Sequence, residues 1–395
     1  MKVLHFTNKP YFPILDGGRL ASHHLLLNLL DLEAEVKNLT ICTHKHPFLI
    51  EHFPEKKIEL IEPEAVHIDT KINFFDGLKS FIKGEAYNLT RFRSTELENK
   101  LIDLLKDNYF DFIIVESIFL LLYLPIIRKN SDAKIIVRTH NVEYRLWKQS
   151  AKKEKSFFKK YYFNKISNQL KKFELSVLNQ VDGILCITEN DRDFFRRRGI
   201  KTRMIAFPVF MDVKKQYEVD YSTNDFCFIG SMNWKPNIEA VNWIAYGILP
   251  KIKKMYPDIK IHIAGSNMSS SMKRMGNQNL IIHGRVEDVY HFMSKHGTLL
   301  VPLKTGSGVR IKILEALSAG IPIIATDKAK EGILVTSKKE YLGGNMSEEI
   351  ILQMKNCINN QDFKLKLGEN AKLFIEEHYS RNKITSKLSE FLSKL

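Results

Sequence analysis

The chain has 395 residues, which is too long for one ordinary hydrophobic core and favours two domains. Hydrophobic residues make up 44% and charged residues 27% of it, a composition that excludes an intrinsically disordered protein. The formal net charge of +15 favours a polyanionic partner such as nucleic acid, anionic lipid or a phosphorylated ligand, without choosing among them.

The sequence favours a cytoplasmic protein that does not span a membrane. The apolar run near the N-terminus is too short for a signal peptide. The most lipid-like stretch, Ser117–Ile127, is about half the ~20 residues of a spanning helix, and Pro125 interrupts it. The cysteines lie far apart and form no C-x-x-C motif, which favours buried thiols in a reducing compartment over disulfides or zinc. They are Cys42, Cys186, Cys227 and Cys357.

Short β-branched runs alternate with helical stretches along the chain. The strands expected in the first half are Lys2–Phe6, Val36–Cys42, Phe112–Glu116, Lys134–Thr139 and Gly183–Thr188. Those expected in the second half are Asp225–Gly230, Lys260–Gly265, Leu280–Gly284, Thr298–Pro302 and Pro322–Thr326. Because the apolar runs are continuous, the pattern predicts parallel sheets that are covered on both faces. So many strands do not fit one open sheet, so we expect an α/β protein with two Rossmann-like domains.

The strand–helix alternation restarts after a polar, turn-rich stretch over residues 207–225. We therefore predict an N-terminal domain over residues 1–208 and a C-terminal domain over residues 209–379. The last helix, within residues 380–395, is expected to return to the first domain.

Two loops of the first half could carry chemistry, because ligands bind beyond the carboxyl ends of parallel strands. Gly17 and Gly18 precede a helix that we expect to begin near Arg19. A glycine pair lets backbone approach a ligand at a helix N-terminus, although a plain tight turn would need the same residues. His140 follows the Lys134–Thr139 strand and could donate a hydrogen bond, move a proton or serve only the structure.

Two loops of the second half are further candidates. Lys235 lies in the turn after the Asp225–Gly230 strand, where it could reach a phosphate or be solvated. Arg285 and Val286 begin the loop after the Leu280–Gly284 strand.

The strongest candidate is the stretch GSGVRIKILEALSAGIP, which begins with the loop residues Gly306, Ser307 and Gly308. A helix is expected from about Val309 to Ser318, before Gly320 and Pro322 end it.

Arg310 and Lys312 are expected in the first turn of that helix, where cations are disfavoured. A bound phosphate would offset this cost, with about 1.5–3 kcal/mol for each charged hydrogen bond. Glu315 lies three residues after Lys312, hence on the same helical face, and a carboxylate is a good acceptor for the two hydroxyls of a ribose. The pattern predicts a site for a sugar nucleotide diphosphate, and the alternative is a surface helix in which Glu315 only forms an ion pair.

These stretches together resemble the family 4 retaining glycosyltransferases, which have the GT-B fold of two facing Rossmann-like domains with parallel sheets and a cleft between them. The second half carries the resemblance best, in FIGSMNWKPNIEAVNWI, HIAG, HGRVEDV, VPLKTGSGVRIKILEALSAGIPIIAT and KAKEGI. The first half carries it more weakly, in DGGR, RTHNVE and FELSVLNQVDGILCIT.

The resemblance implies transfer of a sugar from a nucleotide diphosphate donor held by the C-terminal domain. Glu315 would accept the ribose hydroxyls, and Arg310 and Lys312 would neutralise the pyrophosphate and stabilise its charge as it leaves. Lys235 would assist, and the backbone at Arg285–Val286 would contact the base.

In the N-terminal domain, the resemblance implies that Gly17 and Gly18 line the cleft beneath the diphosphate and that His140 lies beside the transferred sugar. One position departs from the family pattern. Many members have a second glutamate eight positions before the one matched by Glu315, and Ser307 stands there instead. A backbone amide within Gly306–Gly308 would have to replace its contact to the sugar.

No metal and no cofactor beyond the nucleotide sugar is expected. Asp191 and Asp193 form an Asp-x-Asp, but TENDRDFF reads as a helix start with acidic residues in its first turn, which capping explains. Another GT-B enzyme, such as a nucleotide-sugar epimerase or a phosphorylase, is the alternative function. A nucleic-acid-binding protein is a remote alternative that leaves the GSGVRIK stretch unexplained.

A strongly basic stretch in the first half suggests where an acceptor would come from. Residues 148–172 hold nine lysines against one acid, Glu154. The aromatic residues among them are Phe157, Phe158, Tyr161, Tyr162 and Phe163. A second basic cluster comprises Arg192, Arg196, Arg197, Arg198, Lys201 and Arg203. Our hypothesis is peripheral docking at the inner face of the plasma membrane and a lipid-linked or polysaccharide intermediate of cell-surface glycan synthesis as acceptor. The alternative is a solvated helix face.

Overall fold

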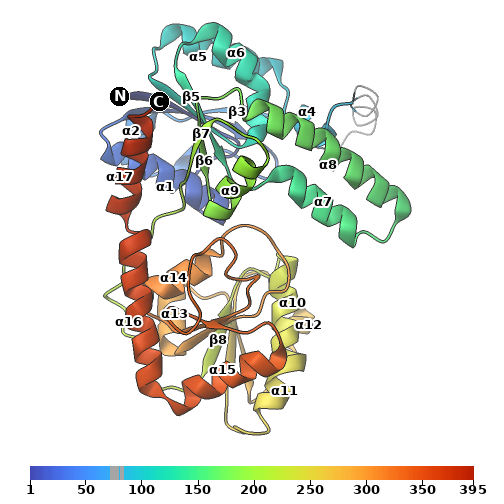
Figure 1. Ribbon diagram of the computed structural model, residues 1–395, viewed down its shortest axis with the longest axis vertical. Coiled ribbons are helices and arrows are strands. Elements are labelled where there is room, and N and C mark those ends of the chain that lie inside the picture. The colour runs from blue at the N-terminus through green and yellow to red at the C-terminus, as the bar shows by residue number, and fades with distance from the viewer. Residues whose placement is uncertain (72–79, 81–83) are drawn as a thin grey trace. The chain divides into compact units, whose positions relative to one another are not determined.

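The computed structural model describes residues 1–71, 80 and 84–395 and shows two compact units (Figure 1). The first unit comprises Met1–Val209 and Ile384–Leu395, and the second comprises Phe210–Lys383. The last helix, α17 (Arg381–Leu392), therefore contributes most of its length to the first unit.

The first unit is built on a sheet that has seven strands within the described residues, in the order β3-β2-β1-β4-β5-β6-β7. Each pair of neighbours is parallel. The strands are β1 (Lys2–Thr7), β2 (Glu35–Cys42), β3 (Glu64–His67), β4 (Phe112–Glu116), β5 (Lys134–Thr139), β6 (Gly183–Cys186) and β7 (Arg203–Ala206).

The second unit has a sheet in the order β10-β9-β8-β11-β12-β13, and its neighbours are again all parallel. The strands are β8 (Phe226–Ile229), β9 (Ile261–Ala264), β10 (Leu280–Gly284), β11 (Thr298–Val301), β12 (Ile323–Ala325) and β13 (Leu342–Gly343). Two all-parallel sheets with helices between their strands confirm the predicted α/β fold class.

Helices connect the strands in both units. Those of the first unit are α1 (Gly17–Asp31), α2 (Glu55–Ile61), α4 (Tyr87–Thr90), α5 (Thr95–Asp107), α6 (Leu124–Asn130), α7 (Glu143–Lys153), α8 (Phe157–Val177) and α9 (Glu189–Arg197). Those of the second are α10 (Lys235–Trp243), α11 (Leu249–Ile252), α12 (Ser270–Lys273), α13 (Val289–Lys295), α14 (Ile311–Ala319), α15 (Ser347–Asn359) and α16 (Gln361–His378).

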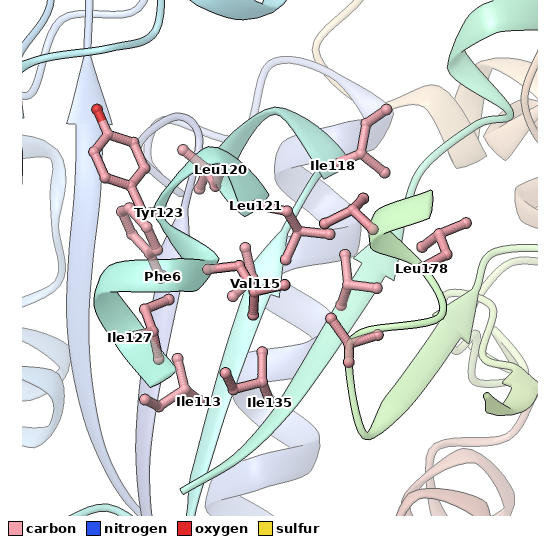
Figure 2. Close-up of a cluster of buried hydrophobic side chains, with 14 of the residues drawn as sticks. Phe6, Ile113, Val115, Ile118, Leu120, Leu121, Tyr123, Ile127, Ile135 and Leu178 are labelled. Atoms are coloured by element: carbon pink, nitrogen blue, oxygen red, sulfur yellow. The ribbon is translucent and has the colours of Figure 1, made fainter. Parts of the chain in front are cut away.

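The core of the first unit explains why the strand runs are continuously apolar. Ile113 and Val115 in β4 and Ile135 in β5 are fully buried, and Figure 2 shows them among side chains from the segment that follows β4. A parallel strand that is covered on both faces needs apolar residues at successive positions, because side chains alternate between the faces. The cysteines are all free, and only Cys42 is less than fully buried.

Three observed strands were not predicted. β3 and β7 are four-residue strands at the two edges of the first sheet, and β13 is a two-residue strand at an edge of the second. Edge strands have one neighbour and less burial, so their apolar pattern is short and interrupted. In β3 only Val66 is buried.

The strand orders place the candidate loops at equivalent points of the two sheets. In each sheet the early strands are added toward one edge and the later strands toward the other. This order reverses between β1 and β4 in the first sheet and between β8 and β11 in the second. Ligands of open parallel sheets bind beyond the carboxyl ends of the strands at such reversal points. His140 follows β5, next to β4, and the Gly306–Gly308 loop follows β11.

Helices α7 and α8 pack against each other and form a hairpin that projects from the rest of the first unit (Figure 1). Within the described part of the chain, no helix combines the length and apolar character needed to cross a membrane.

Candidate active site

The glycine loop after β11 has a backbone that requires its glycines. Gly306 and Gly308 have φ angles of +109° and +80°, values that favour glycine. A Cβ atom at Gly306 would also lie 2.6 Å from the ring of Trp234. The side chain of Thr305 donates a hydrogen bond of 2.7 Å to Glu239 of α10, which fixes the start of the loop.

Helix α14 begins at Ile311, and Arg310 is its N-cap residue with an extended backbone. The expectation that Arg310 lies in the first helical turn is therefore wrong, whereas Lys312 does lie there. The glycine loop offers no Ser, Thr or Asp at the capping position, so Arg310 takes that position without a side-chain cap.

The guanidinium of Arg310 is buried, with 4% of the residue exposed, and carries donors that the protein does not use. Its Nη1 donates to the carbonyl oxygens of Ser307, at 2.5 Å, and Gly308. Its Nε and Nη2 are buried without a hydrogen-bond partner among the described residues. Burial lowers the pKa of Arg310 to about 10, against the attraction of Glu331. Buried donors of this kind are costly unless a ligand accepts from them.

Lys312 reaches back over β8. Its ammonium donates a hydrogen bond of 3.0 Å to Asn237 and lies 4.2 Å from the ring centre of Phe228. Burial and the charge of Arg310 lower the pKa of Lys312 to about 7, although Glu315 opposes the shift. Arg310 and Lys312 thus lie close enough to repel each other, and the hydrogen-bond partner of Lys312 is the side-chain amide of Asn237.

Gly230 makes room for this lysine at the end of β8. A Cβ atom there would lie 2.7 Å from Nζ of Lys312 and 2.5 Å from Nδ2 of Asn237. Gly265, at the end of β9, has φ +154° and would place a Cβ atom 1.9 Å from the carbonyl oxygen of Gly230. The closely packed strand ends therefore bring the lysine and the helix start to one edge of the sheet.

Glu315 lies one turn further along α14 and is half-buried. Burial raises the pKa of its carboxyl, while Lys312 and Lys214 act in the opposite direction. Tyr290, whose pKa burial and the Glu315 charge raise to about 12, is a neutral neighbour. The structure thus brings Arg310, Lys312 and Glu315 together on one short helix start.

The other residues named in the second unit are more open to solvent. Lys235 is the first residue of α10, with 85% of its side chain exposed, 3.9 Å from Glu239. Arg285 and Ser307 are exposed and Val286 is half-buried.

In the first unit, Gly17 and Gly18 form the first turn of α1, two residues earlier than expected. The side chain of Asp16 caps this helix by accepting from the backbone N–H of Arg19 at 2.9 Å. A Cβ atom at Gly18 would lie 2.8 Å from Nζ of Lys9, which itself contacts Asp16 at 2.7 Å.

His140 directly follows β5, and its Nε2 lies 2.6 Å from Oε2 of Glu116. Glu116 is the last residue of β4 and is fully buried. Nε2 of His5 lies 3.0 Å from the other oxygen of Glu116, and Arg138 lies 3.7 Å from it. The charge of Arg138 and the two histidines hold the pKa of Glu116 well below its usual range, in spite of burial.

Sequence reasoning missed Glu116, His5, Arg138 and Asn237. The position of Glu116 at the carboxyl end of a predicted strand was the available signal, since such ends carry ligand-binding loops.

One group among the described residues has the composition of a metal site, namely His262, His283 and His296. Nδ1 of His262 lies 2.8 Å from Nε2 of His283, but the rings of His262 and His296 stack at 3.7 Å. A metal bound in the plane of both stacked rings would need them to turn, so the arrangement does not fit one. Asp191 and Asp193 lie in the first turns of α9, which Thr188 caps by accepting from the backbone N–H of Asp191 at 3.0 Å.

Residues 223–360 match the family model described as Glycosyl transferases group 1. A curated relative from Klebsiella pneumoniae, "Uncharacterized 44.6 kDa protein in cps region", is 25% identical over 332 residues, which cover 80% of each chain.

Two solved structures show the same fold over the whole chain. Anabaena Alr3699/HepE in complex with UDP has a TM-score of 0.68 at 12% identity, and 100% of each chain is covered. Sucrose-phosphate synthase from Thermosynechococcus elongatus has a TM-score of 0.71 at 11% identity, covering 100% of this chain and 99% of that one. These are GT-B structures, and the predicted fold class agrees with them.

Proposed function

Starting from a glycosyltransferase of group 1 type whose family domain spans residues 223–360, we propose that the protein transfers a sugar from a nucleotide diphosphate donor to a lipid-linked or polysaccharide acceptor. The transfer keeps the anomeric configuration of the donor and needs no metal ion. Support for a nucleotide sugar also comes from the structural relative HepE, which was solved with UDP and with UDP-glucose.

The observation that carries this proposal is the pair of cations at the start of α14. Arg310 offers two buried nitrogens without a partner in the described chain, and burial lowers the pKa of Lys312 to about 7. A diphosphate would accept from both side chains and neutralise their mutual repulsion. Because the site excludes much of the water, each such contact is stronger than at an exposed surface.

The same cations would assist the reaction. Negative charge grows on the leaving diphosphate as the bond to the sugar breaks, and Arg310 and Lys312 would stabilise it more than the ground state. The N-terminus of α14 adds its partial positive charge. These groups do electrostatically what a metal ion does in other transferases, and this is why we propose a metal-independent reaction. Glu315 would accept from the ribose hydroxyls.

We place the acceptor at the first unit. The helical hairpin of α7 and α8 carries Phe157, Phe158 and Tyr161 at the start of α8, with exposed fractions of 76%, 83% and 60%. The buried side chains of α8 lie on the opposite face, among them Ile166 and Leu170.

Lysines flank these aromatic side chains on both helices and in the turn between them, at positions 152, 153, 155, 159, 160 and 165. Aromatic rings enter the interface of a bilayer, and each nearby lysine adds about 1 kcal/mol of attraction to anionic lipid. The proposed occupant of this face is therefore an anionic membrane surface that carries the acceptor.

The membrane part is tested by flotation with phosphatidylglycerol-containing vesicles and with neutral vesicles. Wild type should float only with the anionic vesicles, and Phe157→Ser/Phe158→Ser should lose most of that binding. Tyr109→Ser is a matched control, because Tyr109 is 73% exposed elsewhere in the same unit. No flotation of wild type, or equal loss in the control, would remove the membrane from the proposal.

The transfer itself is tested with a panel of UDP-, GDP- and TDP-sugars in the presence of EDTA and a bacterial lipid extract. Release of nucleoside diphosphate from one donor should identify the sugar, and NMR of the product should show the anomer of the donor. Lys253→Ala should retain activity, because Lys253 is an exposed lysine at the end of α11, outside every proposed donor contact.

No release from any donor would contradict the proposal. Conversion of a free donor into its epimer would instead assign the site to an epimerase, whereas an inverted product would overturn retention alone.

A further inference from the structure

Three neighbouring strands of the first sheet bring a chain of buried polar groups to one edge. His5 lies in β1, Glu116 ends β4 and His140 follows β5, and the sheet order places β4 between the other two. Glu116 uses one carboxylate oxygen toward each histidine, at 3.0 Å to Nε2 of His5 and 2.6 Å to Nε2 of His140. The phenol of Tyr11 contacts Nδ1 of His5 at the far end.

The donors and acceptors in this series of polar groups can be assigned starting from Tyr11. Burial and the nearby charge of Glu116 raise the pKa of Tyr11 well above its usual value, so its O–H is present and can donate to Nδ1 of a neutral His5. A neutral imidazole that accepts at Nδ1 carries its proton at Nε2. His5 therefore donates from Nε2 to Glu116.

Glu116 can only accept. Its carboxyl remains ionised because the charges of Arg138 and the histidines hold its pKa well below the usual range. An ionised carboxylate has no proton to donate, so the contact with His140 requires a proton on Nε2 of His140.

Arg138 completes the arrangement from β5. It is fully buried, lies 3.7 Å from Glu116 and donates a hydrogen bond of 2.6 Å to the carbonyl oxygen of Ala21 in α1. Oε1 of the carboxylate thus has His5 and Arg138 beside it. Oε2 has no aligned hydrogen bond within the described protein, and its close neighbour is Nε2 of His140. At 2.6 Å from an ionised oxygen, a protonated Nε2 is attracted, whereas an unprotonated Nε2 would be repelled.

We propose that Glu116 is a positioning residue that fixes His140 as the tautomer protonated at Nε2, so that Nδ1 is the atom offered to a sugar hydroxyl as a hydrogen-bond acceptor. This role for Nδ1 rests on the proposed function, whereas the tautomer itself does not. The imidazole of His140 is 18% exposed, while Glu116 is completely buried, so only the histidine is accessible to a ligand.

The fixed tautomer of His140 has a consequence for catalysis. A free imidazole in water interconverts its tautomers and rotates, and a sugar hydroxyl would have to select one arrangement on binding. In this protein, the carboxylate has already selected it, so the ordering cost is met by folding. His5 and Tyr11 act further back: His5 occupies the second oxygen of Glu116 and leaves only one for His140, and Tyr11 contacts His5.

The tautomer is tested by NMR on the full chain with ¹⁵N-labelled histidine. Long-range ¹H–¹⁵N spectra distinguish a protonated from an unprotonated ring nitrogen, and His140→Asn identifies the signals of His140. At pH 8 we expect wild-type His140 to show a protonated Nε2 and an unprotonated Nδ1, and Glu116→Gln to give a mixture. A protonated Nδ1 in wild type, or an unchanged pattern in Glu116→Gln, would overturn the proposal.

This spectrum needs no substrate, so it remains decisive if the transferase proposal fails. The wild-type result also decides the tautomer if the Glu116→Gln protein does not fold.

A double-mutant cycle tests whether Glu116 acts through His140. With the donor that the panel identifies, Glu116→Gln should lower kcat about 10- to 100-fold, by analogy with loss of the partner that orients a metal-bound histidine. In the His140→Asn background the same change should cause little further loss. Equal losses in both backgrounds would mean that Glu116 serves the structure only.

Glu174→Gln is the matched control. Glu174 is as completely buried as Glu116 and lies in the same unit, but it accepts from the backbone N–H groups of Glu143 and Tyr144 at 3.0 and 3.1 Å. We expect this variant to leave the signals of His140 unchanged. A change of the His140 tautomer in this control would show that any buried carboxyl group near this loop affects it, and would overturn the specific role of Glu116.

Discussion

Each unit has a cluster of buried charges at the carboxyl edge of its sheet, and the two clusters differ in how they are neutralised. In the carboxylate centre of the first unit, Glu116 is surrounded by His5, Arg138 and His140. In the cation pair of the second unit, Arg310 and Lys312 have neighbouring carbonyl and amide oxygens but no direct carboxylate contact among the described residues.

The pKa shifts follow this difference. In the carboxylate centre, opposite charges lower the pKa of Glu116, so its ionised form is favoured. In the cation pair, burial lowers the pKa of Arg310 to about 10 and that of Lys312 to about 7, so the charged forms are disfavoured. A buried charge that is neutralised by protein groups can hold a neighbouring side chain in position. Two buried like charges without a neutralising protein group favour a ligand of opposite charge.

Removal of the cation pair should have the largest effect. Arg310→Ala/Lys312→Ala loses two charged hydrogen bonds of about 1.5–3 kcal/mol each, which corresponds to a fall in kcat/KM of roughly 100-fold or more. Initial rates of nucleoside diphosphate release measure it. A fall below 10-fold would contradict the assignment of the pair to the diphosphate, and Lys253→Ala, at an exposed lysine of the same unit, is the control for a general loss of positive charge.

Glu315→Gln should have a smaller effect, about 10- to 100-fold in KM for the donor, because one amide oxygen replaces a carboxylate acceptor. The raised pKa of Glu315 also predicts that donor binding weakens as the pH falls and the carboxyl is protonated. Glu331→Gln is a control on a nearby acid. Equal effects of the two changes would indicate a general electrostatic contribution.

The pH dependence of nucleotide binding separates the lysine from the arginine. Lys312 has a pKa of about 7 in the free protein, and a bound diphosphate would raise it. Binding should therefore take up about one proton at pH 8, and the affinity should fall about 10-fold per pH unit above 7. Calorimetry in two buffers of different ionisation enthalpy measures the uptake. Lys312→Arg should abolish it, since arginine stays protonated.

The last prediction concerns stability instead of activity and compares two equally buried carboxyls. Burial and the charges of Glu143 and Asp191 raise the pKa of Glu174 to about 8, whereas the charge of Arg138 lowers that of Glu116. The folded protein then binds the proton more tightly than the unfolded chain, so stability falls as the pH rises from about 4.5 to 8, by up to about 1.4 kcal/mol per unit. Glu174→Gln should make this slope shallower in urea unfolding between pH 5 and 8, and Glu143, whose pKa burial raises to about 7, leaves a remainder of the same sign. An unchanged slope would show that Glu174 is ionised throughout.

The second unit was largely predictable because its signals are local. The strand runs, the glycine loop and the charged residues of α14 follow one another within Thr298–Ala319, so the sequence alone placed Arg310, Lys312 and Glu315 near one another. The start of α14 was off by two residues because the loop lacks a capping side chain. The two-residue strand β13 has no pattern of its own to detect.

The carboxylate centre was not predictable in the same way. His5 and Glu116 are separated by 111 positions and meet only because β1 and β4 are neighbours in the sheet. Strand order is a property of the whole domain, and no local pattern encodes it. His140 was named from its strand end, but its partner required the three-dimensional arrangement.

The most direct test of the account is the binding of nucleoside diphosphates to the protein at pH 7 without metal, measured by calorimetry on wild type and on Arg310→Ala/Lys312→Ala. The account predicts that wild type binds at least one of UDP, GDP and TDP, and that the double variant loses about 100-fold or more in affinity. Equal affinity in both proteins, or no binding of any of the three to wild type, would contradict the assignment of the cation pair as the diphosphate site.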